Sequence, residues 1–255
     1  MRIRQHLSLF EAALIVLFAV VATRALVRQS DLRYAGPSLV EPPLLEDLEK
    51  RFGRSRYSMG LEEWFIRDFF NDMKGRVFVD VGAWEPTRGS NTYRLERDLN
   101  WTGLAVDALE EFSPRYRRER PKTMFLSAFV TDVDDGTATL YVPRRLTEVA
   151  SGSEAMVRIF ETAMVARSVR RRTLDSLLDE AGIERFDFLN LDIEMGEPAA
   201  LRGFTIASHR PRLVCVEAHG ATRQAILDYF AVHGYVLVGR YLPYDRVNLY
   251  FTPHD

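Results

Sequence analysis

RVFVDVGA (residues 76–83) and GLAVD (residues 103–107) decide the fold of this chain. Each contains a short run of mostly apolar residues with a carboxylate at or near its end, which is typical of a buried parallel strand. We predict these strands at Val77–Val81 and Gly103–Asp107. Ligands of open α/β sheets bind beyond the carboxyl ends of such strands, so a binding site is expected there.

The residues after the first strand favour a nucleoside cofactor that is held without a phosphate cradle. Gly82 lets the backbone approach a ligand closely, and Asp107 suits the two hydroxyls of a ribose. The G-x-G-x-x-G motif of dinucleotide sites is absent, because Ala83, Trp84 and Glu85 follow Gly82. Glu85 would also repel a pyrophosphate. S-adenosylmethionine therefore suits this turn better than NAD.

The order of the predicted elements indicates a Rossmann-like, doubly wound α/β sheet that is mostly parallel. Further strands are predicted at Met124–Val130, Thr137–Val142, Phe186–Leu191, Leu213–Glu217, Tyr235–Tyr241 and Val247–Thr252, with helices at Leu61–Met73, from Thr173 as N-cap, and at Ala221–Val232. The polar turn before Thr137 suggests a hairpin at the sheet edge. Residues 143–172 lack strand character. The last two strands form an antiparallel hairpin, as in class I methyltransferases.

A separate hydrophobic segment precedes this domain. The apolar run Ala12–Ala22 is too short to span a bilayer as a helix, but Leu7–Val27 is long enough. We predict a membrane anchor at residues 1–28, a linker at 29–55 that becomes helical near Leu44–Phe52, and the catalytic domain at 56–255. A cleaved signal peptide and an amphipathic soluble helix are the alternatives. Arginines after the anchor favour a single-pass protein whose domain faces the cytoplasm.

Composition limits the possible partners and compartments. The chain has 255 residues, is 47% hydrophobic and has a formal charge of -2, so it can bury a full core and gives no reason to expect a nucleic-acid partner. The one cysteine, Cys215, lies in an apolar run and is expected in the core. One cysteine allows no disulfide within the chain.

Several stretches resemble the FkbM family of S-adenosylmethionine-dependent methyltransferases, over about residues 57–253. They are FVDVGA (78–83), SNTYRLERDLNWTGLAVD (90–107), TLDSLLDEAG (173–182), DFLNLDIEMGEPAALRGF (187–204) and PRLVCVEAH (211–219). The resemblance implies a Rossmann-like methyltransferase that usually acts on a hydroxyl. One departure is Trp84-Glu85-Pro86, where many relatives have a glycine before the helix.

The candidate cofactor residues follow from the resemblance and from the strand ends. The resemblance implies that Asp80, Gly82 and Ala83 lie against the cofactor and that Asp107 binds its ribose. Asn91, with Ser90 and Thr92, either contacts the methionine part or caps a helix. Ser127 and Ala128 are small residues near the end of the third strand, where the adenine of such cofactors lies.

A second set of polar residues is expected beside the methyl donor. Asp192 and Glu194 follow one predicted strand, while Glu217 and His219 end the adjacent one, so all four side chains are expected to converge. Crowded carboxylates need a divalent metal, an arginine from residues 144–172 or a shared proton. His219 is the candidate base, with Asp192 and Glu194 as catalytic partners, and all four are candidate metal ligands. Alternatively, the carboxylates only cap helices.

The arginines of residues 167–172 either hold an anionic substrate or form a basic surface next to anionic lipid.

Together these features predict a membrane-anchored, S-adenosylmethionine-dependent O-methyltransferase whose acceptor is a small molecule, a sugar or a lipid. One alternative is a catalytically silent, membrane-tethered binding module of the same fold. Another is a short-chain reductase, but the missing phosphate cradle and the missing Tyr-x-x-x-Lys pair count against it.

Overall fold

The computed structural model describes residues 43–254, and the chain divides into two compact units at residues 51 and 52. The described part of the first unit, residues 43–51, contains all but the last residue of helix α2 (Leu44–Phe52), which confirms the helix predicted at the end of the linker. The predicted anchor, Leu7–Val27, lies outside the described residues. No helix within residues 43–254 is long and apolar enough to cross a membrane.

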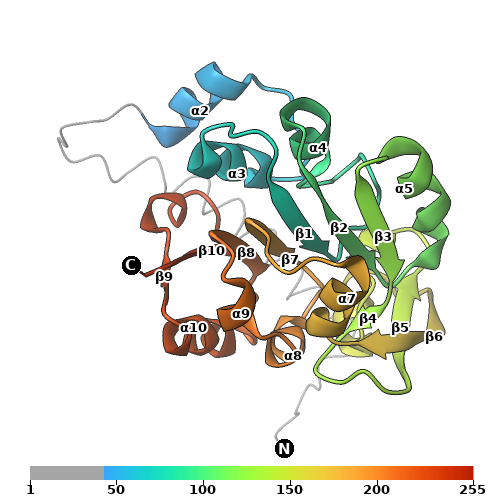
Figure 1. Cartoon of the computed structure of the whole chain (residues 1–255). Coiled ribbons are helices and arrows are strands. Elements are labelled where there is room, and N and C mark those ends of the chain that lie inside the picture. The colour runs from blue at the N-terminus through green and yellow to red at the C-terminus, as the bar shows by residue number, and fades with distance from the viewer. Residues whose placement is uncertain (1–42, 255) are drawn as a thin grey trace, which may run out of the picture. The chain divides into compact units, whose positions relative to one another are not determined.

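The second unit is built on a seven-stranded sheet in the order β3-β2-β1-β7-β8-β10-β9 (Figure 1). Its strands are β1 (Val77–Val81), β2 (Thr102–Asp107), β3 (Thr123–Ser127), β7 (Phe188–Leu191), β8 (Leu213–Glu217), β9 (Tyr235–Leu237) and β10 (Asn248–Pro253). β3, β2, β1, β7 and β8 run parallel, whereas β10 is antiparallel to both β8 and β9. The predicted antiparallel hairpin is confirmed, and its second strand lies between β8 and β9.

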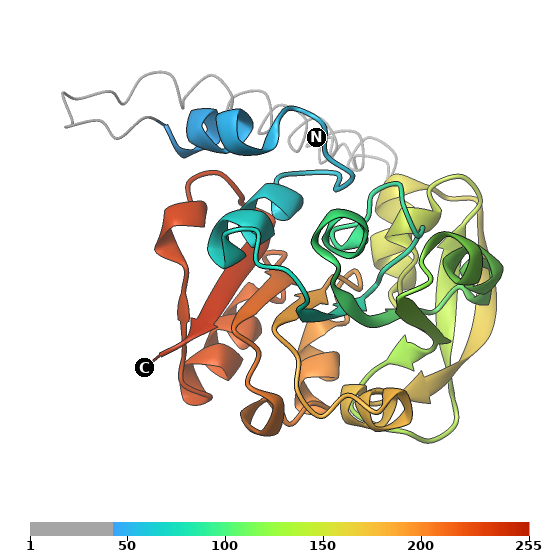
Figure 2. The ribbon, with the colours of Figure 1, turned by 45° about the horizontal axis from the view of Figure 1, so that its top comes forward.

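Helices cover both faces of this sheet (Figure 2). They are α3 (Glu62–Phe70), α4 (Tyr93–Leu99) and α5 (Ser113–Glu119) on one face, and α7 (Leu174–Ala181), α8 (Glu197–Arg202), α9 (Ile206–His209) and α10 (Arg223–Val232) on the other. Short 3-10 turns occur at η1 (Glu110–Phe112) and η3 (Gly239–Tyr241). The main core joins the strands to α7–α10 through fully buried side chains such as Val79, Leu104, Leu189 and Val214. Thr173 caps α7 as predicted, accepting a hydrogen bond from the Ser176 amide.

A second, three-stranded sheet lies between β3 and β7 in the chain, and here the sequence-based expectations are partly wrong. The predicted strand Met124–Val130 breaks at Ala128 into β3 and β4 (Phe129–Val130). β5 (Thr137–Pro143) forms no hairpin on the edge of the main sheet, because it pairs antiparallel with β6 (Met164–Arg172). β6 falls in the stretch predicted to lack strands. Its residues are largely exposed, so the strand needs no alternation of apolar residues.

Between β5 and β6 the chain forms the turn η2 (Thr147–Val149) and helix α6 (Glu154–Phe160), which Ser153 caps. We call residues 143–172 the cover.

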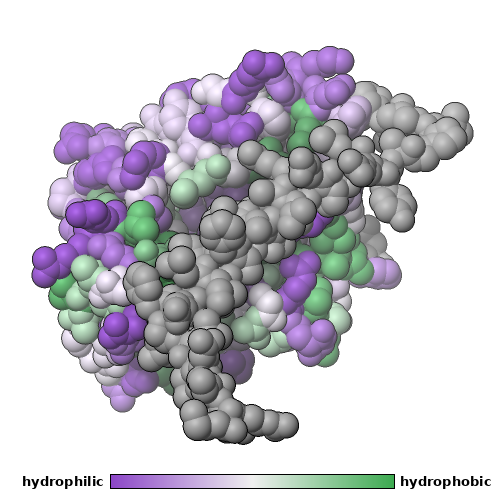
Figure 3. Space-filling model, turned by 180° about the vertical axis from the view of Figure 1, so that it is seen from behind, coloured by the Kyte–Doolittle hydropathy of each residue, from purple (hydrophilic) through white to green (hydrophobic). Residues whose placement is uncertain are grey.

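On the face shown in Figure 3, hydrophobic side chains occur in small groups among hydrophilic ones.

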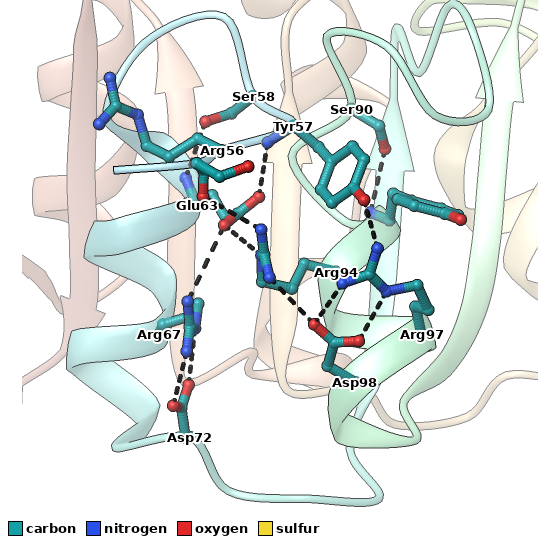
Figure 4. A network of polar contacts seen from close by, with 12 residues as sticks. Arg56, Tyr57, Ser58, Glu63, Arg67, Asp72, Ser90, Arg94, Arg97 and Asp98 are labelled. Carbon is teal, nitrogen blue, oxygen red and sulfur yellow. Dashed lines mark hydrogen bonds and ion pairs between the residues drawn. The ribbon is translucent and has the colours of Figure 1, made fainter. Parts of the chain in front are cut away.

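A buried carboxylate ties α3 to α4 (Figure 4). Glu63 is fully buried and accepts hydrogen bonds from the Tyr57 amide at 2.9 Å and from Arg94 Nε at 2.6 Å. Arg67 lies 3.9 Å from the same carboxylate, and Arg94 also pairs with Asp98 on its own helix at 3.0 Å. The cationic partners compensate the burial of the charge, so the two helices are fixed relative to each other.

A buried arginine ties the loop before α4 to the sheet edge. Arg120 is fully buried, and its Nε donates to Glu96 Oε2 at 2.6 Å. Its other nitrogens donate to the Pro86 carbonyl and to the Ser90 hydroxyl at 3.0 and 3.3 Å, and to Thr92 Oγ1 at 3.2 Å. One guanidinium thus holds the segment that leads into α4.

Replacing this arginine should destabilise the fold strongly. Arg120→Met is expected to lower the free energy of unfolding by about 3–5 kcal/mol, because the buried Glu96 carboxylate loses its only cationic partner among the described residues and keeps just the hydrogen bonds from Thr123 and the Lys122 amide. Urea unfolding measures the loss. Arg117→Met, at an exposed position of α5, the helix that Arg120 follows as C-cap, is the control and should change stability by less than about 0.5 kcal/mol. Recovery of stability in Arg120→Met with Glu96→Gln would support the charge argument, whereas an equal loss in the double variant would contradict it.

Candidate functional site

A cavity of about 300 Å³ opens at the carboxyl ends of β1 and β2. Its inner wall is formed by residues at the ends of the parallel strands, Val81, Gly82, Val106, Asp107 and Ala128, and by the loop Asp192–Gly196 after β7. The cover forms the remaining wall through residues 147–153, and Phe129 and Leu140 add apolar surface. The cavity lies where ligands of open α/β sheets bind.

Gly82 is required by close packing of the backbone. Its φ is +81°, and a Cβ at this position would lie 1.7 Å from the backbone oxygen of Asp192. The glycine therefore brings the end of β1 against the loop after β7, so the protein's own loop makes the close approach that the sequence suggested for a ligand. Ala83 is buried against Tyr116 and does not line the cavity.

Asp107 is held rigidly at the cavity wall. Its two oxygens accept hydrogen bonds from the backbone N–H groups of Trp84 and Leu109, each at 2.8 Å. Burial raises the pKa of this carboxyl to about 6. Each oxygen keeps a further lone pair, so the carboxylate can still accept from two hydroxyls. Ala128 also lines the cavity, whereas Ser127 does not.

Trp84 lines the cavity, although in the sequence it stood out only as a departure from relatives that have a glycine before the helix. It adopts a left-handed conformation with φ +48°, and its indole N–H donates to Thr147 Oγ1 in the cover at 3.1 Å. The turn after β1 is thereby attached to the opposite wall of the cavity. The sequence indicated an unusual turn, because a large aromatic residue stands where many relatives have a glycine. It could not indicate the contact itself, because Thr147 lies far away in the sequence.

Asp80 and Asn91 belong to a buried network and do not line the cavity. Asp80 accepts hydrogen bonds from Thr92 Oγ1 at 2.7 Å and from Asn190 Nδ2 at 2.9 Å. Asn91 donates to Asn190 Oδ1 at 3.1 Å. Burial raises the pKa of Asp80. These residues fix the ends of β1 and β7 and the entry to α4.

The structure brings the predicted acidic residues and His219 together. His219 Nε2 lies 2.9 Å from Glu217 Oε1 and 3.8 Å from Glu194 Oε2. One ligand atom from each of these three residues lies within 4.8 Å of the others. Asp192 adjoins the same group, and burial, followed by the charge of Glu217, raises its pKa well above the usual value. We call Asp192, Glu194, Glu217 and His219 the acidic cluster.

Several polar atoms of the acidic cluster are buried without a hydrogen-bond partner. They include Oε2 of Glu217, a residue that is only 6% exposed, and Oε2 of Glu194. The two carboxylates, Glu194 first, raise the pKa of His219 to about 10, while burial raises that of Glu194. Burial and the crowding of three acidic groups around one imidazole thus favour the protonated forms of Asp192 and Glu194.

Glu197 is a further acidic residue here that the sequence analysis missed. It is fully buried at the start of α8, where Oε1 accepts from the Ile193 amide at 3.0 Å, and burial raises its pKa to about 7. Its place in the first helical turn was the available signal, since carboxylates are favoured there.

The loop that carries Glu194 is strained. Glu194 and Met195 have φ values of +53° and +81°, a conformation that costs about 1–3 kcal/mol for each such residue. Ser151 in the cover donates its hydroxyl to the Glu194 carbonyl at 2.6 Å. The cover therefore contacts both Trp84 and this loop.

Comparison with known proteins identifies the family. Residues 80–237 match the methyltransferase FkbM domain. No curated protein matches the chain. Solved structures similar to it include a Geobacter sulfurreducens S-adenosylmethionine-dependent methyltransferase in complex with S-adenosylhomocysteine (11% identity, TM-score 0.40, 85% of this chain and 100% of that chain). Another is a TehB-like S-adenosylmethionine-dependent methyltransferase from Corynebacterium glutamicum (13% identity, TM-score 0.40, 90% and 99%). Because the domain match spans more than half of its length, the chain belongs to the FkbM family of S-adenosylmethionine-dependent methyltransferases.

Proposed function

We propose that the cavity binds S-adenosylmethionine and that the chain transfers its methyl group to a hydroxyl of an acceptor. The observation that carries this proposal is that Asp107, Ala128 and the loop of Glu194 line one cavity, and that Glu194 also reaches His219. Cofactor contacts and a group able to activate an acceptor are thus adjacent.

The chemistry of the cavity wall supports a cationic cofactor. Asp107, Glu148, Asp192 and Glu194 line it, and no lysine, arginine or histidine does so among residues 43–254. A sulfonium is a cation, so these carboxylates favour the methyl donor over a neutral nucleoside. In the proposed arrangement, Asp107 binds the ribose, Ala128 and Phe129 contact the adenine, and the methionine part points toward Asp192.

Methyl transfer to a hydroxyl requires an oxygen nucleophile. The acceptor oxygen forms a bond to the methyl carbon as the carbon–sulfur bond breaks, so the sulfonium becomes a neutral thioether and the hydroxyl proton must leave. Glu194 lies at the cavity wall and in reach of His219, so the acidic cluster is placed to receive that proton.

We further propose that Glu194, Glu217 and His219 hold a divalent cation. The fit rests on their converging ligand atoms and on one buried oxygen of each glutamate that accepts no hydrogen bond. Mixed imidazole and carboxylate ligands suit Mn, Fe or Zn. Such an ion acts as a Lewis acid that makes a hydroxyl easier to deprotonate. The competing assignment is His219 as a metal-free base.

The acceptor class and the cellular location complete the proposal. A sugar, a lipid or another small molecule that bears a hydroxyl is the expected acceptor. The apolar segment Leu7–Val27 is proposed to hold the chain in a membrane as a single-pass anchor, with the domain on the cytoplasmic side. A silent binding module would show no turnover with any acceptor.

Removing the ribose partner should weaken cofactor binding. Asp107→Ala is expected to cost about 1.5–3 kcal/mol in affinity for S-adenosylmethionine, the scale of a hydrogen bond to a charged group. Isothermal calorimetry on the full chain measures the change. Asp228→Ala, an exposed carboxylate on α10, is the matched control and should bind normally. Unchanged affinity in a folded Asp107→Ala protein would remove this residue from the site.

Cofactor affinity should also fall in mild acid. The hydroxyls of a ribose donate to ionised Asp107, and its pKa is about 6, so the carboxylate is available above that pH and is lost as pH falls through it. Calorimetry across this range should therefore show weaker binding on the acid side. The amide of Asp107→Asn does not titrate, so this variant should lack the part of the pH dependence of cofactor affinity that comes from Asp107. A wild-type profile identical to that of Asp107→Asn would contradict the assignment.

Chelation separates the two roles of His219. If the cation is present, a chelator should abolish turnover and added Mn²⁺ should restore it. If His219 is the base, His219→Ala should reduce turnover about 10²–10⁴-fold. His233→Ala, an exposed histidine after α10, is the control. If His219 is instead a base, turnover should ignore the chelator and rise with pH toward about 10, because only the deprotonated ring accepts a proton.

A further inference from the structure

The cover differs in charge from the rest of the chain. Residues 143–172 contain seven arginines and three glutamates, a net charge of +4, whereas the whole chain carries -2. Several of these arginines are paired, such as Arg158 with Glu154 and Arg167 with Glu111. The side chains of Arg144 and Arg145 are exposed and make no hydrogen bond or ion pair with the described residues.

Large apolar side chains are exposed beside these two arginines. Leu146, Ile159, Phe160 and Val165 are 37%, 58%, 46% and 48% exposed. A patch of apolar residues with a polar rim marks an interaction surface, whereas single exposed apolar residues need no explanation.

Backbone contacts bring these residues to one place. The Arg144 amide donates to the Ala163 carbonyl at 3.0 Å, and the Arg145 amide donates to the Glu161 carboxylate at 3.0 Å. Val165 pairs with Val142 across the β5–β6 ladder, close to the same junction. The end of α6, the start of β6 and the residues after β5 thus form one surface, which we call the basic–apolar patch.

We infer that the basic–apolar patch docks on an anionic lipid bilayer. The exposed apolar side chains match the acyl boundary of a bilayer, and the unpaired guanidiniums match anionic head groups. The net charge of +4 on residues 143–172 is complementary to an anionic bilayer and favours this partner over an uncharged protein surface. Residues 147–153 of the same cover line the cavity, so docking would place the cavity beside the bilayer. This inference does not depend on methyl transfer.

A fluorescent label can report docking in the full chain, whatever its N-terminal segment does. Cys215 is buried, so a cysteine introduced by Phe160→Cys is selectively labelled with an environment-sensitive dye. Vesicles of phosphatidylcholine with phosphatidylglycerol should shift this dye to the blue, and pure phosphatidylcholine should not. The same dye on Val236→Cys, an exposed apolar position on β9, is the control and should remain in water.

Charge variants test the electrostatic part. Arg144→Gln with Arg145→Gln should weaken the apparent affinity for anionic vesicles about 30-fold. Arg117→Gln with Arg118→Gln removes the same charge from exposed positions on α5 and should have little effect.

Four results would overturn the inference: no shift at position 160, equal shifts at 160 and 236, equal shifts with neutral and anionic vesicles, or a dye at 160 that is already shielded without vesicles. The last result would indicate that another segment or a second copy covers the patch. S-adenosylmethionine binding is measured without vesicles, so either proposal can fail alone.

Discussion

The buried carboxylate of Asp80 is the interaction on which the rest of this domain depends. Asp80 lies in the interior strand β1, accepts hydrogen bonds from Thr92 and Asn190, and so joins β1, β7 and the entry of α4 at one point. Arg120 donates to the same threonine and supplies a buried positive charge. Two residues beyond Asp80, Gly82 allows the strand end to pass against the loop after β7. The cavity exists because these two strand ends are held together.

The sequence predicted the parts of this arrangement that follow from strand pairing. Apolar runs located the parallel strands, and the rule that parallel strands end at one edge predicted that Glu194, Glu217 and His219 converge. The hydrogen bonding of Asp107 was predictable for a second reason. A carboxylate that closes a buried strand needs hydrogen-bond partners. Such inferences require only local periodicity and the order of the strands.

Other features depend on partners that periodicity does not reveal. β6 is exposed and rich in arginine, so its pairing with β5 leaves no apolar alternation to read. Asp80 and Asn91 were predicted as cofactor ligands, and the structure shows that both hydrogen-bond to Asn190, about a hundred residues away, a contact that the sequence did not indicate. Trp84 likewise finds its partner, Thr147, in the cover. Predicting these contacts would require knowing which side of each chain segment faces the neighbouring element.

The Asp80–Asn190 contact also affects how the domain folds. Its two residues are separated by 110 positions, so the interior strand β1 cannot gain its β7 neighbour until about two thirds of the domain has been synthesised. Closing so long a loop is entropically costly and slows the folding of chains with distant contacts. Until then, β1 can pair only with β2, and the edge that β7 later covers stays open to other strands. The step that completes this wall of the binding site therefore also closes the open edge of β1, and the far edge of β7 is closed later, when β8 pairs with it.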